Sequence, residues 1–115
     1  MATCELKFDK DVPGIYEGSE VEILDGQAAV EAMSGNNELY HSAFLATIYH
    51  PQCPHCHTMH DDFVKLAHTV KEQQAPVKIV ATNASKFQRA DIDSLNFRGV
   101  PAIRYYTGPG KYVEF

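Results

Sequence analysis

A nearly uninterrupted apolar segment, residues 43–49 (AFLATIY), leads into the longest amphipathic segment of the chain, about residues 54–72. An apolar run without polar alternation is typical of a strand that is covered on both faces, as in a parallel sheet. In the second segment, apolar side chains recur at helical spacing and form one stripe: Met59, Phe63, Leu66, Ala67 and Val70. Pro54 stands where the first turn of a helix tolerates proline. A buried strand followed by such a helix constrains the chain to a layered α/β fold.

The remaining segments extend this pattern to a βαβαβαββ order. Further strands are predicted at residues 21–24, 77–81, 102–106 and 111–115, and further helices at residues 27–33 and about 91–96. The Gly and Pro residues between the last two strands favour a turn, and therefore a hairpin. This order predicts a mixed central sheet, mostly parallel, that ends in an antiparallel pair. We expect residues 21–115 to form one domain and residues 1–20 to be a poorly ordered N-terminal tail.

The composition argues against several classes of function. The chain has 115 residues, the length of one domain, and a net charge of −5 from 10 basic and 15 acidic residues. Because it has no basic run, we expect no nucleic-acid partner. The longest apolar runs are too short for a membrane span, so we expect no membrane segment. Residues 1–14 lack the apolar core of a signal peptide, which indicates either a cytosolic protein or one whose signal was removed.

Two of the three cysteines form the motif C-P-H-C, at Cys53 and Cys56, and this spacing indicates redox or metal chemistry. Cys53 falls at the start of the amphipathic helix, where free N–H groups carry partial positive charge and lower the pKa of a thiol. Cys56 is one turn further on, on the same face and within bridging distance, and should be less exposed. We therefore predict that Cys53 is the nucleophile and Cys56 the resolving thiol. His55 could add charge or a hydrogen bond to the Cys53 thiolate, whereas Cys4 has no predicted function.

Three alternatives remain open. A zinc site would use the four side chains at positions i, i+3, i+4 and i+7, namely Cys53, Cys56, His57 and His60. The rise over that span is about 10 Å and Zn–ligand bonds are about 2.0–2.3 Å, so one helix could offer only two or three ligands. C-P-H-C-H also matches a c-type haem attachment, which would need a large apolar pocket and a second axial ligand. The third alternative is a module that binds unfolded chains without turnover. The redox interpretation predicts no cofactor and no metal. Three further histidines are predicted at the surface: His41, His50 and His68.

Residues 44–56, FLATIYHPQCPHC, resemble the active-site segment of the thioredoxin fold, in which a strand leads into W-C-x-x-C and a helix. Residues 97–101, FRGVP, resemble the loop before the cis-proline of that family, and Leu66-Ala67 and the closing hairpin with Gly108 also match. The spacing and the hairpin are most similar to those of protein disulfide isomerase domains. The Pro-His dipeptide is similar to that of bacterial periplasmic disulfide-forming enzymes.

The resemblance implies a thiol–disulfide oxidoreductase that acts on protein thiols and disulfides in the secretory pathway, in the endoplasmic reticulum lumen or outside the cell. It implies that Cys53 attacks substrate disulfides or receives electrons from substrate thiols, so that disulfides in the substrate are isomerised or formed. It also implies that Pro101 is cis and packs against the sulfur pair, and that the Val100 backbone pairs with an extended substrate peptide. A Pro-His dipeptide implies a stabilised thiolate and an oxidising pair.

The sequence departs from the family pattern at three positions. Gln52 replaces the Trp before the first cysteine, Thr47 replaces a buried acid, and Asp61 replaces a helix proline, so no kink is required. Because Thr47 cannot act as a base, we expect slow resolution of mixed disulfides at neutral pH. The chain stops at Phe115, before the final helix of such domains. We therefore expect either a longer parent chain with other domains or a covering element supplied from elsewhere.

Overall fold

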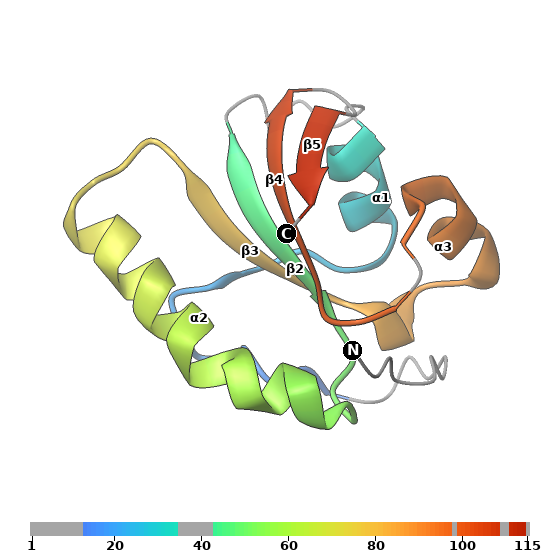
Figure 1. Cartoon of the computed structure of the whole chain (residues 1–115), viewed down its shortest axis with the longest axis horizontal. Helices are drawn as coiled ribbons and strands as arrows, with labels where there is room; N and C mark the ends of the chain where they lie inside the picture. The colour runs from blue at the N-terminus through green and yellow to red at the C-terminus, as the bar shows by residue number, and fades with distance from the viewer. Residues whose placement is uncertain (1–12, 35–42, 98, 109–110, 115) are drawn as a thin grey trace.

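The computed structural model describes residues 13–34, 43–97, 99–108 and 111–114 (Figure 1). Its elements in chain order are β1 (Glu22–Ile23), α1 (Gly26–Ser34), β2 (Phe44–Tyr49), α2 (Pro54–Glu72), β3 (Lys78–Asn83), the 3₁₀ turn η2 (Ala84–Lys86), α3 (Arg89–Leu95), β4 (Ala102–Gly108) and β5 (Lys111–Glu114). The strands form one sheet in the order β1-β3-β2-β4-β5. β2 pairs in parallel with β3 and antiparallel with β4, which confirms the predicted mixed sheet.

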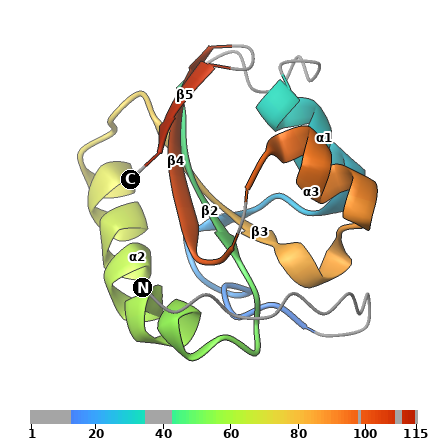
Figure 2. The same cartoon turned by 45° about the vertical axis from the view of Figure 1, so that its right-hand side comes forward.

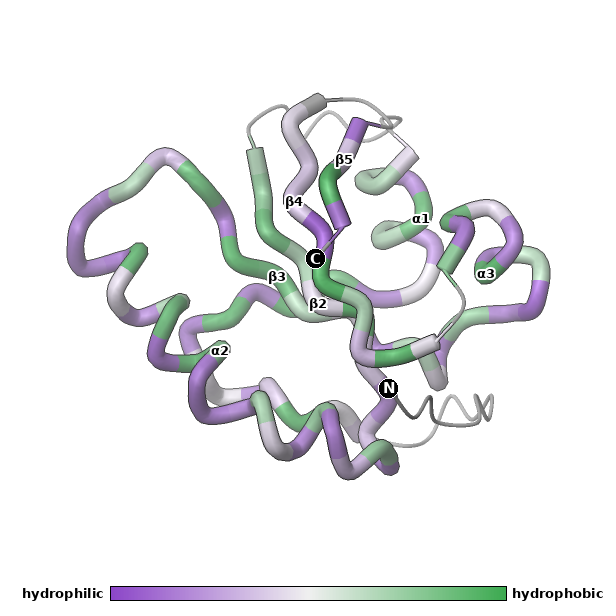
Figure 3. The backbone as a smooth tube through the Cα atoms, in the orientation of Figure 1, coloured by the Kyte–Doolittle hydropathy of each residue, from purple (hydrophilic) through white to green (hydrophobic). Residues whose placement is uncertain are grey.

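Three layers are visible in Figure 2: α2 covers one face of the sheet, and α1 and α3 cover the other. β2 lies in the centre, and five of its six residues are buried. Hydrophobic residues concentrate on β2 and β3 in Figure 3, whereas α2 alternates between hydrophobic and hydrophilic residues. This agrees with the predicted two-sided burial of β2 and with the amphipathic character of α2.

The structure differs from the predicted elements in detail. β1 has only two residues, and both are exposed. α3 begins at Arg89, before the predicted start at residue 91, because a capping box starts the helix: the backbone N–H of Gln88 donates to the Asp91 carboxylate (2.9 Å). On α2, Phe63 and Ala67 are buried, but Leu66 is 39% exposed and lies outside the buried stripe.

Arg104 on β4 is a buried charge that the sequence did not single out. Its side chain is fully buried and donates hydrogen bonds to the carbonyl oxygens of Leu95 and Asn96 at the end of α3. Its Nε also lies 2.8 Å from Glu114 Oε1 on β5. A buried guanidinium is tolerated only when its charge and donors are satisfied in this way. Arg104 therefore ties α3 and β5 to the sheet.

The strand register assigns side chains to the two faces. Ala46 lies opposite Arg104, whose side chain reaches α3, so Ala46 belongs to the face that α1 and α3 cover. Because side chains alternate along a strand, Thr47 and Tyr49 belong to the opposite face, which α2 covers. This face also carries the cysteine motif.

The segment before β1 packs against the face covered by α2. Tyr16 is 1% exposed, and its ring lies edge-on to Tyr49 at a centroid distance of 5.0 Å. The same ring contacts His60 (4.9 Å) and Phe63 (5.8 Å) of α2. The packed core therefore includes a residue of the predicted tail, while the domain boundary at residue 20 stays a prediction.

Candidate active site

Cys53 is the N-cap residue of α2, in the short connection that follows β2. Its backbone is extended (φ −90°, ψ 121°), and Pro54 occupies the start of the helix. The Cys53 carbonyl accepts hydrogen bonds from the N–H groups of Cys56 (3.1 Å) and His57 (3.3 Å). The Cys53 side chain is therefore close to the positive end of the helix dipole. This is the environment that favours a thiolate over a thiol.

Cys56 lies one turn into α2 and is fully buried. Burial raises the pKa of the Cys56 thiol, while a hydrogen bond from the backbone N–H of His50 lowers it by a smaller amount. The thiol form is therefore favoured at Cys56. A thiol in this state does not attack a disulfide until it loses its proton.

The two cysteines are in different states in this structure. Cys56 is a free thiol, whereas Cys53 is disulfide-bonded. The side chains are 1% exposed at Cys53 and 0% exposed at Cys56, so the predicted difference in exposure is not found.

The histidines are distributed differently from the prediction. His50 is 2% exposed, so its predicted surface position is wrong. It directly follows the central strand, and its Nδ1 accepts a hydrogen bond from the Gln52 N–H (3.1 Å), which folds the turn around the ring. His68 is at the surface as predicted, with 58% of its side chain exposed. His55 is exposed on the first turn of α2, and His41 lies outside the described residues.

The segment before β4 lies at the same edge of the sheet as the cysteine motif. The Val100–Pro101 peptide bond is cis. Ala102, the next residue, pairs with Ile48 near the end of β2, and Cys53 follows that end. Val100 is buried and Pro101 is half-buried. The topology thus brings together the two segments that the resemblance assigns to one site, although the substrate-binding roles of Val100 and Pro101 stay predictions.

Two buried hydroxyl groups on the α2 side of the sheet make no hydrogen bond within the described structure: Thr47 Oγ1 and Tyr16 Oη. Thr47 is fully buried. It is the position at which the sequence resemblance predicts an acid. Burial and, to a smaller extent, the nearby charge of Cys56 together raise the pKa of Tyr16 to about 12. Sequence reasoning missed Tyr16, and the apolar pair Ile15-Tyr16 in an otherwise polar stretch was its only signal.

The residues of the zinc alternative are not assembled into a metal centre. In the described part of the chain, no group of three or more His, Cys, Asp or Glu side chains could hold a metal ion. The His57 ring is hydrogen-bonded to the Pro51 carbonyl, and the His60 ring packs on Tyr16.

Two surface hollows, of about 470 and 460 Å³, are lined by residues other than the cysteines. Among the helices of the described residues, none is both long and apolar enough to cross a membrane.

Neither a protein-family model nor a curated protein sequence matches the chain. Solved structures do match it. The J-Trx1 fragment of ERdj5 has a TM-score of 0.68 and 20% identity, over 87% of this chain and 46% of that one. The first thioredoxin domain of mouse protein disulfide-isomerase A4 has a TM-score of 0.63 and 20% identity, over 93% and 69% of the two chains. The first two thioredoxin domains of Saccharomyces cerevisiae Eps1p have a TM-score of 0.63 and 23% identity, over 82% and 34%.

These similarities show the fold. The chain has a thioredoxin fold, and a protein disulfide isomerase domain is among the structures that it resembles, as the sequence predicted. The chain spans less than half the length of the ERdj5 fragment.

Proposed function

We propose that this chain is a thiol–disulfide oxidoreductase that acts on protein substrates through Cys53 and Cys56. One observation carries the proposal: Cys53 caps the helix that follows the central strand of a thioredoxin fold, and Cys56 lies one turn behind it. In this position the helix dipole favours the Cys53 thiolate, which is the form that exchanges with disulfides.

The proposed reaction is two successive exchanges. The Cys53 thiolate attacks one sulfur of a substrate disulfide, the substrate S–S bond breaks, and the other substrate sulfur leaves as a thiolate. Cys56 then loses its proton and attacks the Cys53 sulfur. The Cys53–Cys56 bond forms, the second substrate thiolate leaves, and two electrons have passed to the substrate. The same steps in reverse oxidise a substrate dithiol.

The other predicted residues take supporting roles in this proposal. The backbone of Val100, beside the cis Pro101, pairs with an extended substrate segment, and the exposed His55 supplies charge or a hydrogen bond to the Cys53 thiolate. Formation or isomerisation of disulfides requires an oxidising compartment, because cytosolic thiols are kept reduced. We therefore propose a location in the secretory pathway, in the endoplasmic reticulum lumen or outside the cell.

Reduction of an insulin disulfide by the purified protein tests this function, with Cys4→Ser as the background so that only the motif cysteines react. Cys53→Ser should abolish turnover, because the attacking thiolate is lost. Cys56→Ser should leave the first attack intact and accumulate a mixed disulfide that mass spectrometry detects at Cys53. Full activity of the Cys53→Ser variant would rule the proposal out.

Restoring the family's acid tests the expected slow step. Thr47→Glu should accelerate turnover at neutral pH by roughly tenfold or more, because a buried carboxylate can take the Cys56 proton. Thr47→Gln is the matched control, since it has a similar size and no basic group. Equal turnover in the Glu and Gln variants would count against a slow resolution step.

A binding module without turnover is the second candidate, and the burial of both cysteine side chains favours it. This function predicts that affinity for an unfolded peptide is unchanged when Cys53 and Cys56 are both replaced by Ser. Loss of capture in that double variant would favour the redox function instead.

A further inference from the structure

Tyr16 lies against the face of α2 that carries Cys56. Cys56, His60 and Phe63 are spaced i, i+4 and i+7 along α2, so their side chains share one face. The Tyr16 ring contacts two of these three residues, His60 and Phe63, and it also contacts Tyr49 at the end of β2. Tyr16 is thus held between the central strand and the cysteine-bearing face of the helix.

The Tyr16 hydroxyl is buried without a partner. Tyr16 is 1% exposed, and its Oη makes no hydrogen bond within the described structure. A buried hydroxyl without a partner costs free energy and is rare in native proteins, so each such group needs an explanation, of which a redox or catalytic role is one. Cys56 lies one turn before His60 on the helix face that the Tyr16 ring contacts, and its charge raises the pKa of Tyr16, so the two side chains are neighbours, although no hydrogen bond joins them in this structure. A thiol is a weak acceptor, but a thiolate is a strong one.

The hydroxyl can donate but cannot act as a base. Burial and the Cys56 charge keep the pKa of Tyr16 at about 12, so the phenol stays protonated at physiological pH. The titratable groups in contact with its ring are His60 of α2 and Tyr49 of β2, and Cys56 of α2 acts on it electrostatically. Thr47, on the same face, has no basic group either. The surroundings of Cys56 therefore contain donors for a thiolate in place of the family's acid.

We infer that the Tyr16 hydroxyl is the hydrogen-bond donor that stabilises the Cys56 thiolate when a mixed disulfide on Cys53 is resolved. This inference rests on the proposed function and makes Tyr16 a catalytic residue, because its hydroxyl would contact the reacting Cys56 sulfur. The His50 backbone N–H already donates to the Cys56 sulfur, and Tyr16 adds a second donor once that sulfur becomes an anion. No proton needs to leave Tyr16, because the Cys56 proton goes to solvent.

Stopped-flow reaction of the reduced protein with excess 5,5′-dithiobis(2-nitrobenzoate) tests the inference in the Cys4→Ser background. The first release of thionitrobenzoate depends on reagent concentration and reports attack by Cys53. The second release is independent of concentration and reports attack by Cys56 on the mixed disulfide. Tyr16→Phe should slow the second release about fivefold or more and leave the first unchanged, because a hydrogen bond to an anion is lost. The pH–rate profile of the second release should also move to higher pH.

Tyr49→Phe is the matched control. It also removes a hydroxyl from a ring that contacts Tyr16, but the Tyr49 hydroxyl accepts a hydrogen bond from the Ile15 N–H (3.3 Å). The Tyr49→Phe variant should therefore lose stability and keep the rate of the second release. An unchanged second release in Tyr16→Phe, or an equal slowing in Tyr49→Phe, would overturn the inference.

A second measurement separates this inference from the proposed function. In a variant with Cys4→Ser and Cys53→Ser, Cys56 is the only thiol, and its titration can be followed by the ¹³Cβ chemical shift of labelled cysteine. Adding Tyr16→Phe should move the Cys56 titration to higher pH, even if the parent protein shows no turnover. An unchanged Cys56 titration would overturn the role of Tyr16 and leave the proposed function of Cys53 intact.

Discussion

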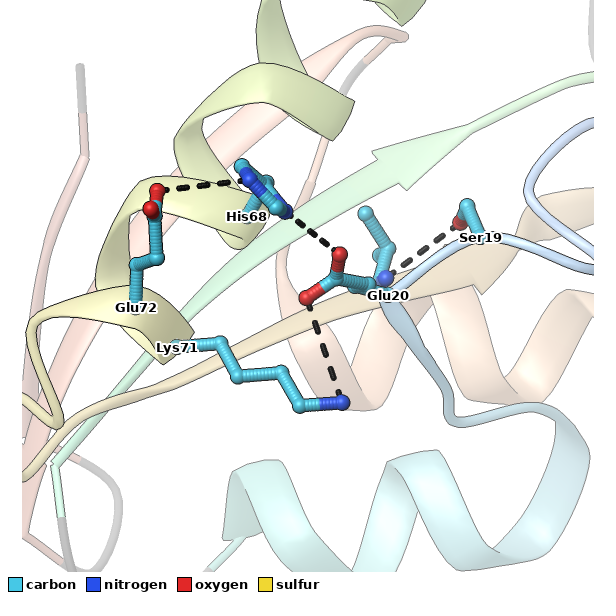
Figure 4. Close-up of polar contacts among 6 residues, drawn as sticks. Ser19, Glu20, His68, Lys71 and Glu72 are labelled. Atoms are coloured by element: carbon cyan, nitrogen blue, oxygen red, sulfur yellow. Dashed lines mark hydrogen bonds and ion pairs between the residues drawn. The ribbon is translucent and has the colours of Figure 1, made fainter.

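The segment before β1 contacts α2 at two places that differ in physical character. Near the cysteines, the buried Tyr16 packs on His60 and Phe63. About two turns further along α2, His68 and Lys71 contact Glu20 of the segment at the surface (Figure 4). His68 Nδ1 lies 2.6 Å from Glu20 Oε1, and Lys71 Nζ lies 3.9 Å from Glu20 Oε2. His68 also reaches Glu72 (3.3 Å), so the exposed contact is a small ionic network.

Solvent access decides what each contact can do. At the exposed contact, the hydrogen bond to His68 lowers the pKa of Glu20, and the same bond raises the pKa of His68. Water and salt screen such charges, so the network contributes little to stability. At the buried contact, burial shifts the pKa of Tyr16, and ring packing supplies most of the stability. The comparison indicates that Tyr16 contributes most of the stability of the contact between this segment and α2, and that the Glu20 network contributes little.

The largest expected effect comes from removing the buried ring. Tyr16→Ala should lower the free energy of unfolding by about 3 kcal/mol, because it leaves a cavity between β2 and α2. Tyr16→Phe should change it by less than about 1 kcal/mol, since the deleted hydroxyl has no partner to lose. Urea denaturation measures both variants. A loss in Tyr16→Ala no larger than in Tyr16→Phe would remove the distinction between the two contacts.

The ionic network should act only within a pH window. The pKa of His68 is raised above 6.5 in the folded state, so its contribution is complete below pH 6.5 and is lost as the pH rises through the folded value. The pKa of Glu20 is lowered below 4.5, so its contribution is complete above pH 4.5 and is lost as the pH falls through the folded value. Both groups therefore contribute fully between these two pH values.

His68→Gln tests this window. The Tm difference between the parent and this variant should be largest in the pH window and should disappear at alkaline pH. Glu20→Gln should give a similar pH profile, because it breaks the same bond, with a small difference left at alkaline pH from the lost contact with Lys71. A Tm difference that persists unchanged at alkaline pH would show that the contact does not depend on the charge of His68.

The smallest effect is expected at Lys71. Its ammonium group lies 3.9 Å from Glu20 and its side chain is 76% exposed. Lys71→Met should leave Tm unchanged at about 1 M salt, where charges beyond roughly 3 Å are screened. A salt-resistant decrease in Tm would place Lys71 among the packing contacts rather than the ionic ones.

Much of the fold followed from local patterns. The apolar run of β2, the period of α2 and the Gly and Pro residues before β5 predicted the element order and the mixed sheet, and the bounds of α2 agree with the prediction. Such patterns depend on side chains a few residues apart, so they can be read in one dimension. The same patterns could not show that Leu66 is exposed and that His50 is buried, because those positions depend on which layer lies opposite.

The sequence by itself determined where the cysteine motif stands, at the start of a helix behind a buried strand. That placement needs only strand and helix periodicity and the tolerance of a first turn for proline. Only the tertiary structure decided what surrounds the second cysteine. Tyr16 is separated from it by 40 positions in the sequence, and Arg104 joins elements that no local pattern links. The physical reason is that burial, and with it each pKa shift and each missing hydrogen-bond partner, is a property of the packed layers and not of any one segment.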